Sequence, residues 1–174
     1  DCRHISAVVK GLTLHNFYVP AGGDEPDIDK NPKFSHKLNF IAEMTKHFSQ
    51  QQPSRSILVG DLNIAPLAED VWSTRQLRNT VSHTAIEREN LLALVEQGGW
   101  TDSVRAHFGP KEVLFSWWSY RARDWVASNR GRRLDHIWVS RDLASKVEAV
   151  TIESAMRGAE KPSDHVPLTI TLQP

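Results

Sequence analysis

The sequence predicts a single layered domain of the α/β or α+β class, because strand-like and helix-like segments alternate along its 174 residues. Three observations support this prediction. Residues 5–19 contain two β-prone runs that meet at Gly11, as in a hairpin. Apolar residues recur at helical spacing over residues 33–50. Residues 57–59 form a short, wholly apolar run, which is typical of a buried central strand.

The first half of the chain defines a hairpin, a loop and a helix. The hairpin strands are expected at residues 5–10 and 12–19. A loop rich in glycine, proline and acidic residues follows at 20–32. The helix over residues 33–50 places its apolar side chains on one face, so we expect that face to pack against the sheet.

The second half contains one well-marked helix and several strands. A long irregular stretch is expected at residues 61–83. Thr84 and Glu87 then form a capping box that opens a helix, and the glycine pair at 98–99 ends it. The remaining strands are expected at residues 114–119, 134–140, 147–153 and 166–172.

The composition excludes several classes of protein. Hydrophobic residues make up 40% and charged residues 24%, and 21 basic residues balance 21 acidic ones, so the chain is not a polycation. No apolar run is long enough to span a bilayer, and no signal-peptide pattern opens the chain. The single Cys2 cannot form an internal disulfide or a zinc site of several cysteines, which favours a cytoplasmic protein.

Two short polar motifs adjoin predicted strands. Asp61 and Asn63 come directly after the strand at 57–59. The carboxylate could serve as a general base or a metal ligand, and the amide could donate a hydrogen bond to an oxyanion or a phosphate. Asp164 and His165 stand before the last strand and offer a hard oxygen ligand beside a titratable imidazole. The structural alternative is an ordinary turn in each case, since Gly, Asp, Asn and Ser all favour turns.

Asp135 lies within an apolar strand, where an unpaired carboxylate is costly. A cationic partner such as an imidazolium would relieve this cost, as when an aspartate orients a catalytic histidine. Alternatively, Asp135 lies on the polar face of a half-exposed strand.

An arginine-rich and tryptophan-rich stretch spans residues 117–141, with six arginines, no lysine and two acidic residues. Arginine binds phosphates with bidentate geometry, and aromatic rings stack on bases or sugars, so this stretch favours a nucleic-acid contact. The alternative is a solvated hairpin with some tryptophans in the core, Trp138 above all.

In order along the chain, these motifs resemble one known family. The matching motifs are YVP at 18–20, GDLNIAP at 60–66, SWW at 116–118, RLDH at 133–136 and KPSDH at 161–165. Together they resemble the bacterial exonuclease III and apurinic-apyrimidinic endonuclease group of the endonuclease/exonuclease/phosphatase superfamily. The resemblance extends over essentially the whole chain.

The resemblance implies a four-layered αββα sandwich of the DNase I-like type and Mg²⁺-dependent hydrolysis of phosphodiesters, with Mn²⁺ as a substitute. The implied partner is double-stranded DNA, cut at abasic sites or from 3′ ends. Asp61 would orient or deprotonate the attacking water, while Asn63 and Tyr18 would contact the scissile phosphate. His165 would hold a phosphate oxygen, and Asp135 would fix its tautomer.

The resemblance also implies metal and DNA ligands. Metal ligands would come from Asp61, Asn63, Asp164 and His165. Contacts to DNA would come from Trp117, Trp118, Arg132 and Arg133, although Arg132 stands where some relatives carry an aromatic residue.

Compared with this family, the chain begins late. It matches roughly the C-terminal two-thirds of a family domain, and the glutamate that is a principal metal ligand in relatives has no counterpart here. We therefore expect residues 1–174 to form an N-terminally incomplete domain that binds Mg²⁺ poorly and exposes sheet edges. A missing segment or a second chain would then be needed to complete the sheet.

Three other functions are compatible with parts of the sequence. The chain could be a superfamily cousin that hydrolyses another phosphoester, but such a cousin would not need the SWW motif or the arginine-rich stretch. It could be a secreted DNase I-like enzyme, which would normally carry disulfides and a signal peptide. It could also be a non-catalytic fragment that keeps only affinity for DNA, marked by salt-sensitive binding without turnover.

Overall fold

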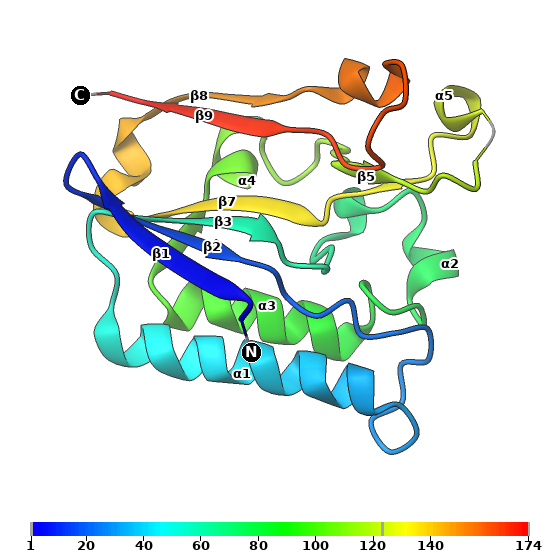
Figure 1. Ribbon diagram of the computed structural model, residues 1–174, viewed down its shortest axis with the longest axis horizontal. Coiled ribbons are helices and arrows are strands. Elements are labelled where there is room, and N and C mark those ends of the chain that lie inside the picture. Colours follow the sequence, from blue (N-terminus) through cyan, green and yellow to red (C-terminus); the bar gives the residue numbers. More distant parts are fainter. Residues whose placement is uncertain (1, 123, 174) are drawn as a thin grey trace.

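The computed structural model describes residues 2–122 and 124–173, whose helices and strands stack in layers (Figure 1). The strands are β1 (His4–Val9), β2 (Leu12–Phe17), β3 (Ser56–Asp61), β4 (Trp100–Asp102), β5 (Trp117–Trp118), β6 (Gly131–Arg132), β7 (Asp135–Ser140), β8 (Val147–Ile152) and β9 (Leu168–Leu172). The α-helices are α1 (Pro32–Gln51), α2 (Thr74–Leu77), α3 (Ala85–Gln97), α4 (Ser103–Phe108) and α5 (Trp125–Ser128).

The larger sheet has five strands in the order β1-β2-β3-β7-β4. β2 and β3 run parallel, whereas the other pairs are antiparallel. The hairpin β1–β2 confirms the one predicted around Gly11. β3 and β7 pair so that Asp61, at the end of one strand, lies directly opposite Asp135, at the start of the other. The register therefore brings two predicted site residues to the same edge of the sheet.

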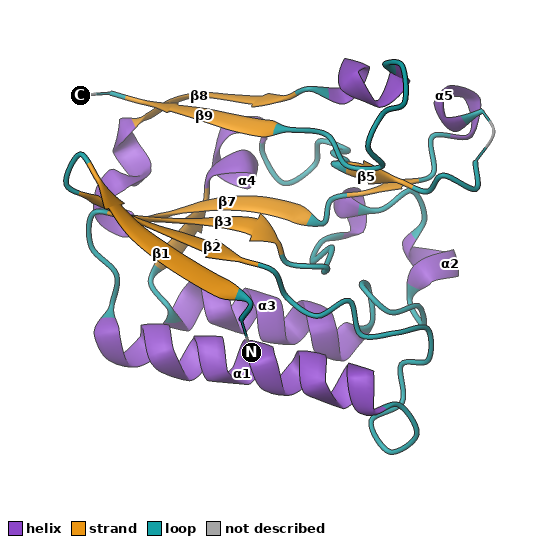
Figure 2. Ribbon diagram, viewed as in Figure 1, coloured by secondary structure: helices purple, strands orange, loops and turns teal. Residues whose placement is uncertain are grey.

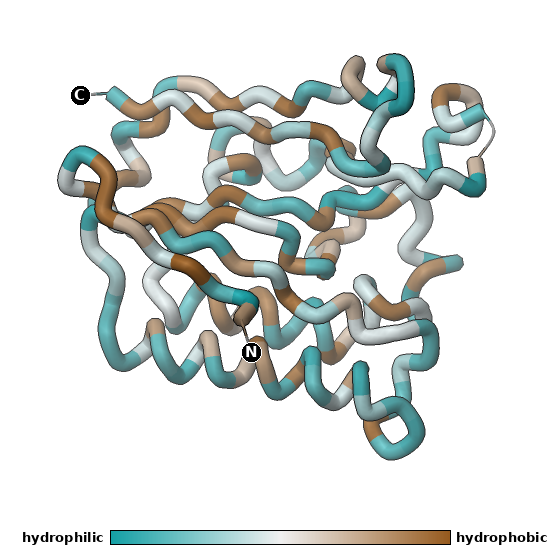
Figure 3. The backbone as a smooth tube through the Cα atoms, viewed as in Figure 1, coloured by the Kyte–Doolittle hydropathy of each residue, from teal (hydrophilic) through white to brown (hydrophobic). Residues whose placement is uncertain are grey.

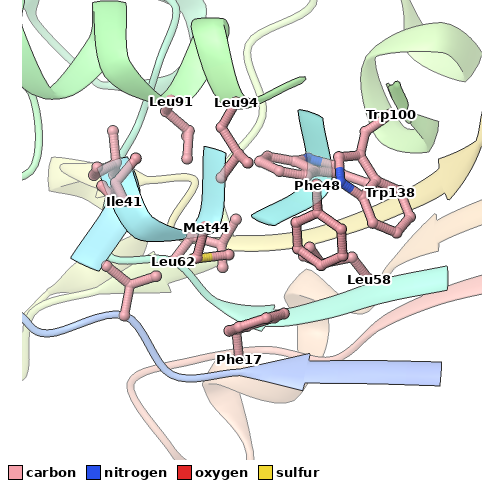
Figure 4. Close-up of a cluster of buried hydrophobic side chains, with 12 residues drawn as sticks. Phe17, Ile41, Met44, Phe48, Leu58, Leu62, Leu91, Leu94, Trp100 and Trp138 are labelled. Atoms are coloured by element: carbon pink, nitrogen blue, oxygen red, sulfur yellow. The ribbon is translucent and has the colours of Figure 1, made fainter. Parts of the chain in front are cut away.

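Helices α1 and α3 cover one face of this sheet (Figure 2). α1 begins where expected, because Asn31 accepts a hydrogen bond from the backbone N–H of Lys33 and a proline stands at the first turn. The capping box of Thr84 and Glu87 opens α3 as predicted. The main core lies between these helices and the sheet (Figure 4), and it includes Trp138, which is fully buried as expected.

Two smaller sheets have two strands each, β5–β6 and β8–β9. The β8–β9 sheet lies over the other face, with α4 packed between β7 and β8 (Figure 2). β9 alternates hydrophobic and less hydrophobic residues (Figure 3), so that Leu168 and Ile170 join the inner cluster while Thr169 and Thr171 are exposed. Within the described ranges no helix covers the outer face of β8–β9. The chain thus shows three layers of the expected four-layered sandwich.

Several predicted boundaries differ from the structure. The strand expected at residues 114–119 is reduced to two residues, because Leu114 and Ser116 donate backbone hydrogen bonds to two different segments, at Glu69 and Arg132. β4 and α4 were not predicted. Asp102 caps α4 by accepting from the backbone N–H groups of Val104 and Arg105. In the part of the chain that the structure describes, no helix is long and apolar enough to cross a membrane.

Candidate active site

The end of β3 positions an aspartate and an asparagine side by side. Asp61 Oδ1 accepts from the backbone N–H of Asn63 at 2.9 Å, and Asp61 Oδ2 accepts from Asn63 Nδ2 at 3.1 Å. Asn63 has a positive φ of 53°, a left-handed conformation that asparagine tolerates better than most residues. Gly60 has a φ of 137°, and a Cβ there would come within 1.9 Å of the Phe17 carbonyl oxygen. This close approach to β2 requires glycine.

A serine, an aspartate and a histidine form the opposite side of the site. Asp135 Oδ2 accepts from His165 Nδ1 at 2.8 Å and from Ser116 Oγ at 2.7 Å. Ser116 Oγ in turn accepts from the backbone N–H groups of Leu134 and Asp135, both at 3.0 Å. Ser116 had no predicted role. Its hydroxyl orients Asp135. Because His165 Nδ1 is bonded to Asp135, the other ring nitrogen, Nε2, is free to meet a substrate.

The pKa of the histidine on one side of the site and that of the aspartate on the other are both raised, for different reasons. Burial alone would lower the pKa of His165, but the hydrogen bond and charge of Asp135, with the charges of Asp61 and Asp164, outweigh it and raise this pKa. Burial and then the charge of Asp135 raise the pKa of Asp61 to about 6. The site therefore combines a histidine whose cationic form is stabilised by its neighbours with a carboxylate that is a stronger base than usual.

Trp117 connects the arginine-rich stretch to this site. Trp117 pairs with His165 in an isolated antiparallel bridge, and its indole N–H donates to Asp164 Oδ2 at 3.0 Å. The Arg132 guanidinium lies 5.3 Å from the centre of the Trp117 ring and donates through Nη1 to Ser82 Oγ at 2.8 Å. Both predicted DNA-contact residues are partly exposed, so they form a cationic and aromatic rim beside His165.

Two other predicted DNA contacts are wrong. Arg133 is fully buried and bonds Asp70 through Nε at 2.6 Å and Asp102 through Nη1 at 2.8 Å, so its charge is neutralised inside the protein. Trp118 is also buried and donates its indole N–H to Asn129 Oδ1 at 3.0 Å. Trp118 faces inward because it is adjacent to Trp117 on β5, and adjacent residues on a strand point to opposite sides. Arg133 follows β6 and is held inside by its ion pairs with Asp70 and Asp102.

Tyr18 follows β2 and reaches the site mainly through its neighbour. The backbone N–H of Val19 donates to the Asp61 carbonyl at 3.0 Å, and Asn63 Nδ2 donates to the Val19 carbonyl at 2.9 Å. The Tyr18 ring is half exposed, and the Arg3 guanidinium lies 5.2 Å from its centre. Tyr18 thus lies at the sheet edge where β2 and β3 end, on an accessible surface.

The residues described do not form a full metal centre. Among residues 2–122 and 124–173 no group of three or more His, Cys, Asp or Glu side chains is placed to hold a metal ion. Asp61 and Asp164 are hard oxygen donors of the kind that Mg²⁺ prefers, but Asp164 Oδ2 already accepts from Trp117. His165 Nδ1 is bonded to Asp135, so Nε2 is the ring nitrogen left to meet a ligand or a metal ion.

This fold and this site define a class of protein. Residues 20–165 match the model of the Endonuclease/Exonuclease/phosphatase family. Since the match covers most of the chain, the protein belongs to this family, which confirms the resemblance indicated by the motifs.

Individual relatives narrow the similarity to one branch. The chain is 31% identical over 164 residues to Exodeoxyribonuclease III of Haemophilus influenzae, covering 90% of this chain and 60% of the relative. It superposes on an AP endonuclease from Archaeoglobus fulgidus with a TM-score of 0.89 at 30% identity, covering 98% of this chain and 65% of that one. A Neisseria 3′ phosphatase, NExo, bound to a product DNA hairpin gives a TM-score of 0.88 at 29% identity over 98% of this chain and 65% of that one. The chain thus spans less than two thirds of the length of each.

Proposed function

We propose that the protein is a DNA-repair nuclease of the exonuclease III type that hydrolyses phosphodiester bonds in duplex DNA, at abasic sites and from 3′ ends. The observation that carries this proposal is the Asp135–His165 pair placed across from Asp61. A cationic donor and a basic carboxylate on two sides of a phosphate supply what hydrolysis requires. The relatives' names, an exodeoxyribonuclease, an AP endonuclease and a 3′ phosphatase, support this class of reaction.

In this mechanism His165 acts as a hydrogen-bond donor. Its Nδ1–H keeps its hydrogen bond to Asp135, while its Nε2–H donates to a non-bridging oxygen of the scissile phosphate. Negative charge grows on that oxygen as water attacks phosphorus, so the interaction is stronger in the transition state than in the bound substrate. The bond from phosphorus to the leaving oxygen then breaks, and the leaving oxygen takes a proton from solvent water, giving a phosphate monoester and a hydroxyl end.

Asp61 acts as the base in the same step. With its pKa raised to about 6, it is mostly ionised at neutral pH and still accepts a proton from the attacking water. Asn63 keeps Asp61 in place through two hydrogen bonds, and to contact the phosphate its Nδ2 would exchange its bond to Val19 or to Asp61 for one to a phosphate oxygen. Tyr18 contacts the phosphate or the attacking group from the loop after β2.

Trp117 and Arg132 provide the contacts to DNA beyond the scissile phosphate. Trp117 would line a pocket for an extruded abasic sugar, and Arg132 would bind a neighbouring phosphate from above the ring. An abasic nucleotide has lost the stacking of its base, so its extrusion costs less than that of an intact nucleotide. A reaction on DNA fits a cytoplasmic protein, which the single Cys2 also favours.

The cofactor that we propose is Mg²⁺, which Mn²⁺ would replace. Such a cation supplies charge stabilisation to the phosphate oxygens during attack. Asp61, Asn63 and Asp164 would contribute oxygen ligands, and the remaining ligands would come from water, from DNA or from protein outside this chain. No step assigned above to His165 or Asp61 depends on those ligands.

The proposal is tested by cleavage of labelled duplexes, one with an abasic-site analogue and one with a recessed 3′ end, in Mg²⁺ and in EDTA. Because the chain is expected to bind Mg²⁺ poorly, wild-type cleavage should be weak and abolished by EDTA, and Asp61→Ala should reduce it about 100-fold or more. Asp24→Asn, which changes an exposed carboxylate in the loop after β2, is the control and should cleave like the wild type. Salt-sensitive DNA binding without cleavage by the wild type would instead support a non-catalytic fragment.

A further inference from the structure

Lys37 is a buried cation next to the candidate active site that the mechanism above does not use. It lies on α1, and its side chain has no exposed surface. Its ammonium donates three hydrogen bonds, to the Ala21 carbonyl at 3.2 Å, the Asn63 carbonyl at 2.8 Å and Glu87 Oε1 at 2.5 Å. These bonds use all three of its protons.

Glu87 holds this ammonium in a fixed position. The two carboxylate oxygens of Glu87 accept from the backbone N–H of Ser82 at 2.9 and 3.0 Å, and Oε2 also accepts from Thr84 N–H and Thr84 Oγ at 3.1 and 2.6 Å. Glu87 is therefore locked into the first turn of α3. A buried ion pair of this kind seldom stabilises a protein more than apolar side chains of similar volume would. Its benefit must lie in the geometry that it imposes.

That geometry concerns two loops of the site. Ala21 belongs to the loop that carries Tyr18 and Val19, and Asn63 belongs to the loop that carries Asp61. Asn63 has a left-handed backbone, a conformation that requires support from its surroundings. The bond from Lys37 to the Asn63 carbonyl gives this support. It also leaves the side-chain amide of Asn63 aimed at Val19 and Asp61.

We propose that Lys37 is a positioning residue of the active site, whose ammonium, anchored by Glu87, holds the loops after β2 and β3 at the spacing that lets Asn63 hold Asp61 toward the substrate. The role assigned to those two residues rests on the proposed function, whereas the effect of Lys37 on the loops does not. Lys37 does not touch the phosphate and acts through the peptide of Asn63.

The first test compares three variants with the wild type. Lys37→Met alone leaves Glu87 as an unpaired buried charge and risks unfolding, so the decisive variant is Lys37→Met/Glu87→Gln, whose new amide oxygen still accepts from Ser82 and Thr84. We expect its thermal midpoint to return close to that of the wild type while kcat falls about 10- to 100-fold and KM for duplex DNA changes less than about twofold. Leu94→Ala, in the core beneath the sheet, is the control that destabilises the fold and should keep kcat.

A second measurement does not require cleavage. In ¹⁵N NMR spectra the side-chain amide of Asn63 should exchange slowly with water in the wild type and become fast or broadened in the double variant. The side-chain amide of Gln52, which bonds the Ser49 and Gln97 carbonyls far from the site, should be unchanged. An unchanged Asn63 amide, or a wild-type kcat in the double variant where the wild type cleaves, would overturn the proposal.

The two measurements separate the two proposals. If the wild-type chain does not cleave DNA, the proposed function fails for this chain, and the Asn63 signal alone decides the role of Lys37. If the wild type cleaves and the double variant keeps full kcat, the proposed function stands and Lys37 is a structural residue only.

Discussion

Replacing Arg133 with methionine should destabilise the protein strongly without changing how it binds DNA. Arg133 was predicted to contact DNA, but its guanidinium lies wholly inside the protein between Asp70 and Asp102. Methionine matches the length of the arginine stem and has no charge. The substitution thus removes the cation and leaves the two carboxylates where they are.

The size of the effect follows from these partners. Arg133 bonds Asp70 twice, at 2.6 and 3.1 Å, and Asp102 once, at 2.8 Å. After the substitution Asp70 keeps its ion pair with Arg105, while Asp102 loses its cationic partner. Removing one member of a buried ion pair costs about 3–5 kcal/mol, and we expect a loss in this range. Arg130→Met, which removes an exposed arginine stacked on Trp72, should cost less than about 1 kcal/mol.

The assay has two parts. Urea unfolding at pH 7 gives the free energy of unfolding for the wild type and both variants. Binding to a duplex at several salt concentrations gives the slope of log K against log[salt], which falls by about 1 for each phosphate contact that is lost. A stability close to that of the wild type with a reduced slope in Arg133→Met would refute the structural assignment and restore the predicted DNA contact.

Three further predictions concern the site itself. In Asp135→Asn the His165 pKa should fall, because the partner that stabilises the imidazolium is gone. The alkaline limb of the pH–rate profile should therefore move to lower pH, and an NMR titration of His165 measures the shift directly. Asp61→Asn should raise the free energy of unfolding by roughly 1–3 kcal/mol at pH 7, because a raised carboxyl pKa means that ionisation weakens the fold. Urea unfolding should show this gain shrinking as the pH falls through about 6 and vanishing below about pH 4, where the aspartate is protonated in both the folded and the unfolded state. Gly60→Ala should cost more than about 2 kcal/mol or prevent folding, whereas Gly109→Ala, which meets no atom within 4 Å, should cost about 1 kcal/mol; thermal unfolding distinguishes the two.

The sequence predicted the features that depend on local patterns. The hairpin at Gly11, the cap of α3 and the apolar strand before Asp61 all follow from short-range spacing, and each is present. The apolar strand around Asp135 predicted a cationic partner for this carboxylate, and the family resemblance implied that the partner is His165; the bond is 2.8 Å long.

The features that were missed depend on long-range partners. Whether Arg132 or Arg133 faces inward depends on Asp70, which lies 63 residues before Arg133, and nothing in the local sequence marks that pairing. Lys37 and Glu87 are 50 residues apart and each is an ordinary charged residue on a helix. The role of Ser116 depends on a carboxylate 19 residues later in the chain.

The parallel pairing of β2 with β3 has a consequence for the order of folding. The site draws on four well-separated parts of the chain, which carry Tyr18, Asp61, Asp135 and His165. The Asp135–His165 bond joins residues that are 30 apart in the sequence. Contacts between distant residues form late, since each must first overcome the entropy of closing a loop. The helices and the β1–β2 hairpin can therefore form before the two sides of the site meet. The site is complete only when the segment before β9 lies beside Trp117, so we expect the arrival of His165 beside Asp135 to follow the formation of the hairpin and the helices.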